Sequence, residues 1–207
     1  MKLYIAPRAP NPRRVQMFLA EKGLQIEQVE VPIMSGAHRA PEFVAINPLA
    51  RVPVLELDDG RHLSETRAIC HWIEGHHPEP NLMGVDADEH AFIEMHDRRA
   101  EISLLLPIAN WIRHSHPGLA PLEQPQFMDF GRSQGEKVIE LARIFDTELA
   151  QRPWWAGERF TIADITAYCA LEFARGLMKF RPSDHGLASL QAWRDRVHAR
   201  PSSSAGM

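Results

Sequence analysis

The sequence has 207 residues, of which 44% are hydrophobic and 24% charged, as in an ordinary globular protein and unlike a disordered chain. A formal net charge of -4 and a pI of about 6.3 argue against nucleic acid or an anionic membrane surface as the main partner. No apolar run approaches the roughly 20 residues of a membrane span, no signal peptide opens the chain, and Cys70 and Cys169 lie far apart, so we expect a cytoplasmic protein.

The first part of the sequence alternates between strand and helix patterns. Residues 2–5 predict a short strand, and Asn11-Pro12 opens a helix whose apolar stripe ends before Gly23. A second strand follows at residues 25–31 and a short helix at 42–46. Residues 52–57 and 61–63 flank a tight turn, and another helix begins after Ser64. This order, β-α-β-α-β-β-α, predicts a compact α/β domain over residues 1–77.

The strand signals stop after a proline-rich stretch, so residues 78–86 are predicted to be a linker and residues 87–207 an all-helical domain. Long helical patterns cover residues 86–114 and 123–151. Thr161 and Asp164 have the spacing of a capping box, and the helix behind them is apolar on nearly every side, which predicts a central helix. A last helix covers residues 187–199, and a polar tail starts at Pro201.

Three groups of residues occur in the order found in one known family. The segments Asn47-Pro48-Leu49-Ala50-Arg51-Val52-Pro53-Val54-Leu55 and Leu63-Ser64-Glu65-Thr66-Arg67-Ala68-Ile69 resemble the glutathione-site signature of the glutathione transferase family. Gly157-Glu158-Arg159-Phe160-Thr161-Ile162-Ala163-Asp164 resembles the capping motif of that family's C-terminal domain. The start of the chain is similar to bacterial members, with some similarity to the Nu class. Because the segments span almost the whole chain, it is identified as a member of this family.

The resemblance implies a fold and a chemistry. The fold would be a thioredoxin-like domain with a mixed four-stranded sheet and a cis peptide bond before Pro53, followed by an all-helical domain. Glutathione would be the co-substrate, a hydrophobic electrophile or a disulfide the second substrate, and no metal would be needed. A homodimer and a role in detoxification are also implied.

The same resemblance implies a glutathione site. Thr66 and Glu65 would hold the γ-glutamyl carboxylate and ammonium at a helix start, where main-chain N–H groups favour an anion. His38 and Arg51 would meet the glycine carboxylate. The main chain of Val52, turned outward by the bond before Pro53, would pair with the extended peptide. Taken alone, Ser64 to Thr66 is also an ordinary helix start, and a loop His or Arg is usually a solvated surface residue.

The thiol of glutathione needs a partner of its own. A cysteine-type thiol has a pKa of about 8.5, and lowering it to about 6.5 takes roughly 2.7 kcal/mol. A helix N-terminus supplies roughly 0.3–1 kcal/mol and a hydrogen bond to a charged group about 1.5–3 kcal/mol, so one donor at the start of the first helix suffices.

Relatives of the Ser and Cys types place that donor or cysteine near Ala9, whose methyl side chain has neither a hydrogen-bond donor nor a thiol. Asn11 is the nearest capable side chain and is the predicted catalytic residue. Two alternatives stay open: Asn11 only caps its own helix, or Arg8 and main-chain N–H groups stabilise the thiolate. The absence of cysteine between Arg8 and Asn11 excludes a glutaredoxin-like dithiol.

The first long helix carries a candidate pocket for the second substrate. Its residues recur at i, i+4, i+5 and i+8 and are Leu106, Asn110, Trp111 and His114. Ordinary helix packing explains the same pattern equally well. The pair His76-His77 matches no known ligand spacing, so we expect no metal site there.

Three functions are compatible with these residues. The leading prediction is a glutathione transferase that activates the thiolate for attack on an electrophilic small molecule. The Nu-like start and Ala9 favour a second, a glutathione-dependent disulfide-bond reductase. Ala9 also keeps open a third, a non-catalytic binding or scaffold protein that retained the fold.

Overall fold

The computed structural model describes residues 1–207, and its internal contacts divide the chain into two units. The first comprises Met1–Asn81 and Pro201–Met207, and the second comprises Leu82–Arg200. The division falls inside the predicted linker. The tail from Pro201 onward, which was predicted to belong to the helical domain, packs in the first unit because buried Arg13 donates hydrogen bonds to the carbonyls of Ser203 (2.7 Å) and Ala205 (3.2 Å).

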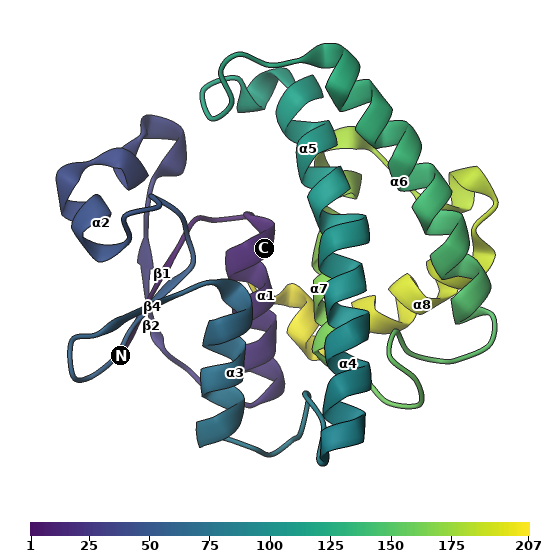
Figure 1. Ribbon diagram of the computed structural model, residues 1–207, viewed down its shortest axis with the longest axis horizontal. Coiled ribbons are helices and arrows are strands. Elements are labelled where there is room, and N and C mark those ends of the chain that lie inside the picture. The colour runs from purple at the N-terminus through teal and green to yellow at the C-terminus, as the bar shows by residue number, and fades with distance from the viewer. The chain divides into compact units, whose positions relative to one another are not determined.

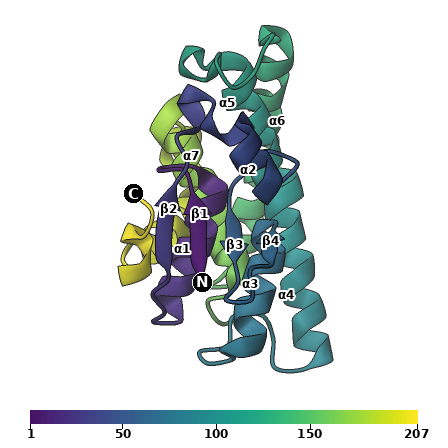
Figure 2. The same cartoon turned by 90° about the vertical axis from the view of Figure 1, so that its left-hand side faces the viewer.

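The first unit is built on a mixed four-stranded sheet with the order β2-β1-β3-β4, whose strands face the viewer in Figure 2. Strand β1 pairs in parallel with β2 and antiparallel with β3, which in turn pairs antiparallel with β4. The mixed sheet is therefore confirmed. Each strand is short; the bounds are Lys2–Ile5 for β1, Glu27–Glu30 for β2, Val54–Glu56 for β3 and His62–Ser64 for β4.

Helices cover both faces of this sheet. Helices α1 (Pro10–Glu21) and α3 (Thr66–His76) lie side by side on one face, and the short helix α2 (Pro41–Ile46) belongs to the other (Figure 1). Successive side chains of β1 point to opposite faces of the sheet, so the strand contributes to a core on each face. Leu3 and Ile5 are buried, whereas Tyr4 points the other way and packs edge-on against Phe43 of α2 at 6.1 Å between ring centroids.

The second unit consists of helices. They are α4 (Ala87–Ala100), α5 (Leu106–Ser115), α6 (Met128–Leu149), α7 (Ile162–Met178) and α8 (Ala188–His198). Helices α4 and α5 run end to end as one rod, joined by a π-helical turn at Glu101–Leu105 (Figure 1). Pro107 explains that turn, because a proline removes an N–H and its ring clashes with the carbonyl four residues earlier. None of the helices combines the length and the apolar character that a membrane span requires.

Helix α7 is the centre of this unit, as predicted, and every residue from Ile162 to Leu171 is buried. Its capping box is also confirmed: Asp164 accepts hydrogen bonds from the N–H of Thr161 (2.9 Å) and, with its other oxygen, from the N–H of Trp155 and the indole of Trp193 (both 2.8 Å). Burial raises the pKa of Asp164 to about 6, and these donors oppose the shift because they favour the carboxylate. Asp164 thus joins the helix start to the preceding loop and to α8.

Candidate functional site

In α1, Asn11 does not occupy the N-cap position that the sequence suggested. Helix α1 begins at Pro10, so Ala9 is the N-cap and Asn11 is the second helical residue. Proline suits the first helical position, because its φ is already helical and its missing N–H would be unpaired there in any case. Asn11 is exposed and does not cap its helix. The alternative in which this side chain serves only as a cap is therefore wrong.

The first turn of α1 concentrates its hydrogen-bond donors on Asn11. Pro10 and Pro12 have no N–H, so Asn11 carries the sole main-chain donor among the first three helical residues. Its side-chain oxygen Oδ1 accepts a hydrogen bond from the Nη1 of Arg14 at 3.3 Å. Because that bond occupies the oxygen end of the amide, the opposite end, the Nδ2 group, is the one left to donate.

Arg14 is a residue of the site that the sequence patterns did not single out. Its side chain is 1% exposed, which is rare for an arginine and shows that its position is fixed by packing. It lies three residues after Asn11, the spacing at which side chains on a helix meet. The spacing of three residues between Asn11 and Arg14 was the sequence signal that could have predicted this contact.

The start of α3 is tied to the start of α1. Thr66, the first residue of α3, is 6% exposed, and its hydroxyl donates to the main-chain oxygen of Asn11 at 3.4 Å. Glu65 precedes it as the N-cap, is exposed, and makes no side-chain capping bond. The first N–H groups of α3 are consequently without a side-chain cap, and two predicted site residues, Asn11 and Thr66, are in direct contact.

The loop before β3 presents an unpaired stretch of main chain. Neither the N–H nor the C=O of Val52 makes a hydrogen bond, and the peptide bond between Val52 and Pro53 is cis. Buried Asn47 shapes this loop: its amide nitrogen donates to the carbonyl of Arg51 at 2.8 Å and its amide oxygen accepts from the N–H of Leu49 at 3.1 Å. The side chain of Arg51 is exposed. The loop can therefore accept an extended peptide at Val52.

His38 differs from the surface residue that a loop histidine suggests. It lies in the 3-10 turn Ala37–Arg39 and is 9% exposed. Its orientation is therefore set by the protein rather than by solvent. Figure 2 shows this turn close to α2, beyond the end of the sheet.

Unusual backbone conformations cluster at the predicted ligand residues. Four residues other than glycine have positive φ, and three of them are Arg8 (61°), Ala50 (52°) and Glu65 (71°). Each lies within three residues of Asn11 or next to Arg51 or Thr66. Such conformations cost free energy and are characteristic of ligand-binding loops, because the surrounding structure must enforce them.

The four residues predicted on α5 have different surroundings. Leu106 is 52% exposed, and Asn110 is half-buried with no side-chain hydrogen bond. Trp111 packs edge-on against Phe180, and a Cβ on Gly135 would come within 2.9 Å of its ring, while the Nδ1 of His114 accepts a hydrogen bond from the N–H of Phe127 at 3.1 Å. These contacts favour ordinary packing for Trp111 and His114 and leave Leu106 and Asn110 as the candidates for ligand contact.

No group of three or more His, Cys, Asp or Glu side chains is arranged to hold a metal ion. Both cysteines are 1% exposed, so no protein thiol is available near the start of α1.

Comparison with known proteins gives one consistent result over the whole chain. Residues 3–81 match the pattern described as the N-terminal domain of glutathione S-transferase, and residues 131–196 match its C-terminal domain. Glutathione S-transferase 2 of Saccharomyces cerevisiae is 38% identical, covering 98% of this chain and 87% of the relative.

Solved structures agree. The crystal structure of Gtt2 from Saccharomyces cerevisiae superposes with a TM-score of 0.91 at 38% identity, covering 98% of each chain. The crystal structure of a glutathione S-transferase domain-containing protein from Marinobacter aquaeolei superposes with a TM-score of 0.92 at 42% identity, covering 98% of this chain and 99% of that one.

Proposed function

The chain belongs to the glutathione S-transferase family, and from this membership we propose that it binds glutathione in its first unit and stabilises the thiolate with Asn11. The observation that carries the proposal is the hydrogen bond from Arg14 to the oxygen of the Asn11 amide, because it leaves the nitrogen end of that amide as the donor. The similarity to the Nu class remains a prediction.

The peptide part of glutathione has a partner for each polar end. The unpaired N–H and C=O of Val52 would bond the cysteinyl main chain as an added strand does. The γ-glutamyl carboxylate would lie at the start of α3 by Thr66, and Glu65 would take the ammonium. His38 and Arg51 would hold the glycine carboxylate.

Asn11 would supply the stabilisation that the thiolate needs. Its main-chain N–H and its Nδ2 group belong to one residue at the positive end of a helix of 12 residues. One hydrogen bond to a charged sulfur, about 1.5–3 kcal/mol, together with the helix end, about 0.3–1 kcal/mol, covers most or all of a two-unit pKa shift of roughly 2.7 kcal/mol. The sulfur would then form a bond to an electrophilic carbon while the leaving group departs with the bonding electrons.

The disulfide-bond reductase is the second candidate, and the burial of both cysteines defines how it would have to work. With no protein thiol available, one glutathione would attack the disulfide and a second would resolve the mixed disulfide. Both candidate activities need the same stabilised thiolate. The preferred substrate therefore distinguishes them, whereas a substitution of Asn11 would affect both.

The test compares turnover of a chlorinated aromatic compound with turnover of a mixed glutathione disulfide in the wild type and in Asn11→Asp. The aspartate keeps an acceptor for Arg14, so the fold is preserved, but it has no donor for the sulfur. We expect the wild type to prefer the chlorinated compound, and the variant to lose about 10–100-fold in rate at neutral pH, as the loss of one charged hydrogen bond requires.

A preference for the mixed disulfide would establish the reductase instead. Unchanged rates in Asn11→Asp would remove Asn11 from the mechanism. Glutathione binding by calorimetry without turnover of either compound would indicate the non-catalytic alternative.

A homodimer is part of the proposal and is supported by the outer face of α4. Phe92, Met95 and Ile102 are 62%, 43% and 57% exposed, and their spacing places them on one side of the rod formed by α4 and α5. A second copy of the same helix would cover them in a symmetric contact.

A further inference from the structure

A buried arginine joins α1 to the tail segment, which we define as residues Pro201–Met207 of the first unit. Arg13 is 8% exposed, and its Nη2 and Nε groups donate to the carbonyls of Ser203 at 2.7 Å and Ala205 at 3.2 Å. A charged group that is buried needs such acceptors, because an unpaired donor would lose its bonds to water without replacement. The tail segment is therefore part of what keeps the side chain of Arg13 in place.

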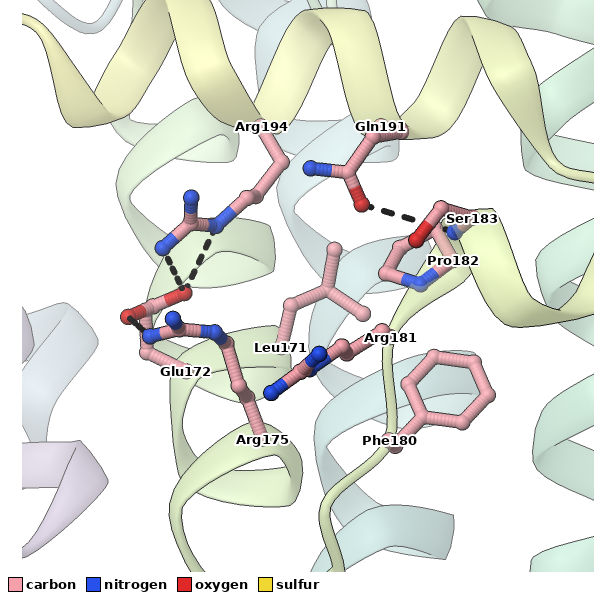
Figure 3. A pocket seen from close by; sticks show the side chains of 9 residues that line it. All are labelled: Leu171, Glu172, Arg175, Phe180, Arg181, Pro182, Ser183, Gln191 and Arg194. Atoms are coloured by element: carbon pink, nitrogen blue, oxygen red, sulfur yellow. Dashed lines mark hydrogen bonds and ion pairs between the residues drawn. The ribbon is translucent and has the colours of Figure 1, made fainter.

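A buried arginine of the second unit is held in a different way. Figure 3 shows Arg194 of α8 bonded to Glu172 of α7, with 2.8 and 2.7 Å from its Nε and Nη2 groups to the carboxylate. That pair joins two long helices, whereas the two carbonyls that accept from Arg13 belong to a short segment. A displacement of the tail segment would remove both of these acceptors from Arg13 at once.

The end of the tail segment fits closely against α1. Gly206 has a φ of 70°, and a Cβ at this position would lie 2.2 Å from the Oε1 of Gln16 and 3.0 Å from the Cγ of Arg13. Gln16 is itself fixed, because its Nε2 group donates to the Oε1 of Gln28 on β2 at 2.7 Å. A residue larger than glycine would therefore push the tail segment away from α1.

Arg13 also closes the first turn of α1. Its main-chain N–H donates to the carbonyl of Ala9 at 3.2 Å, which is the first main-chain hydrogen bond of the helix. Asn11 lies within this turn, between two prolines. One residue thus has its side chain bonded to the tail segment and its main chain bonded around Asn11.

We propose that the tail segment holds the first turn of α1 in place and that Arg13 is a positioning residue for the thiolate site. This inference rests on the proposed role of Asn11. The tail segment would fix the direction of the main-chain N–H and the Nδ2 group of Asn11, and donors that are fixed in advance stabilise a charge better than mobile ones. Arg13 acts through the turn and not on the sulfur.

The test weakens the contact from both of its sides. Arg13→Met removes the donors but keeps a long side chain, and Arg13→Lys restores a donor on a long side chain. Gly206→Ala adds one methyl group against Gln16 and Arg13. The matched control is Gly60→Ala, because Gly60 also has a positive φ, 82°, but its Cβ would enter open space.

The first measurement is amide hydrogen exchange without glutathione. We expect Arg13→Met and Gly206→Ala to lower the protection of the amide at position 13 about tenfold or more, and Arg13→Lys to lower it less. The amide of Ile69 closes the first turn of α3 by donating to the carbonyl of Glu65 at 3.0 Å, so it is the internal reference and should not change. Equal protection at position 13 in the wild type, Gly206→Ala and Gly60→Ala would overturn the proposal.

The second measurement follows the ionisation of bound glutathione by ultraviolet absorbance. Gly206→Ala should raise the pKa of the bound thiol by about 0.5 units, which is an approximately threefold change in the ionisation constant, and Gly60→Ala should leave it unchanged. Faster exchange at position 13 with an unchanged pKa would also overturn the proposal, because the contact would then be purely structural. A wild type without a thiolate signal would contradict the proposed role of Asn11, and the exchange measurement would then decide whether the tail segment holds the turn.

Discussion

At the scale of single residues, the site depends on which end of one amide faces the ligand. An asparagine side chain has a donor end and an acceptor end, and only the donor end stabilises a thiolate. Arg14 distinguishes the two ends because an arginine can only donate. We therefore propose that Asn11 faces the sulfur and that Arg14 orients Asn11.

This division of roles predicts the behaviour of Arg14→Met. The variant keeps a long buried side chain but has no donor, so the Asn11 amide is free to rotate. We expect the rate at neutral pH to fall about fivefold, as for the loss of one hydrogen bond of about 1 kcal/mol, and the pH profile of kcat/KM to move to higher pH.

The control for Arg14→Met is its thermal unfolding, which shows whether the fold is intact. A pH profile that coincides with that of the wild type, while the Asn11→Asp profile moves, would show that Arg14 does not orient the amide.

These residues were not equally predictable from the sequence. The proposed glutathione residues stay predictions that rest on a motif, and the structure adds that Thr66 contacts Asn11 directly. The roles of Arg14 and Asn47 were not predictable. Both depend on burial, which turns an ordinary polar side chain into a fixed one, and burial is set by tertiary packing rather than by local pattern.

At the scale of elements, the periodic patterns predicted every strand and the main helices, and the errors lie at helix starts. Helix α1 begins two residues before the predicted first helical residue, Pro12, because Pro10 occupies that position. Helix α6 begins at Met128, five residues after the predicted Glu123, because Pro125 interrupts the stretch before it. The π-helical turn between α4 and α5 leaves too weak a signal to predict.

The capping box of α7 links three segments of the second unit. In Asp164→Ala, the N–H groups of Thr161 and Trp155 and the indole of Trp193 lose a buried acceptor. We expect the free energy of unfolding to fall by about 3 kcal/mol or more, because each unsatisfied buried donor costs about 1–3 kcal/mol. Urea denaturation measures the change.

Ser204→Ala serves as the control for Asp164→Ala, since its hydroxyl bonds only locally and is exposed. A loss of stability no larger for Asp164→Ala than for Ser204→Ala would contradict the structural role of Asp164.

At the scale of the whole molecule, we expect an assembly of two chains through α4. The variant carrying Phe92→Asp and Ile102→Asp places charges in the proposed contact. Light scattering should give twice the 23.5 kDa chain mass for the wild type and the single mass for this variant.

The matched control for the dimer is Ile144→Asp, which alters an exposed apolar side chain of α6. Dissociation by Ile144→Asp, or a wild type that is already monomeric, would refute a contact through α4.

The role of Asn11 is tested most directly by the ultraviolet absorbance of the thiolate of bound glutathione, followed against pH in the wild type and in Asn11→Asp. We expect the wild type to ionise bound glutathione about two pH units below the free thiol, and Asn11→Asp to return the transition toward that of the free thiol. Equal transitions in the two proteins, or no thiolate signal from the wild type at saturating glutathione, would contradict this role.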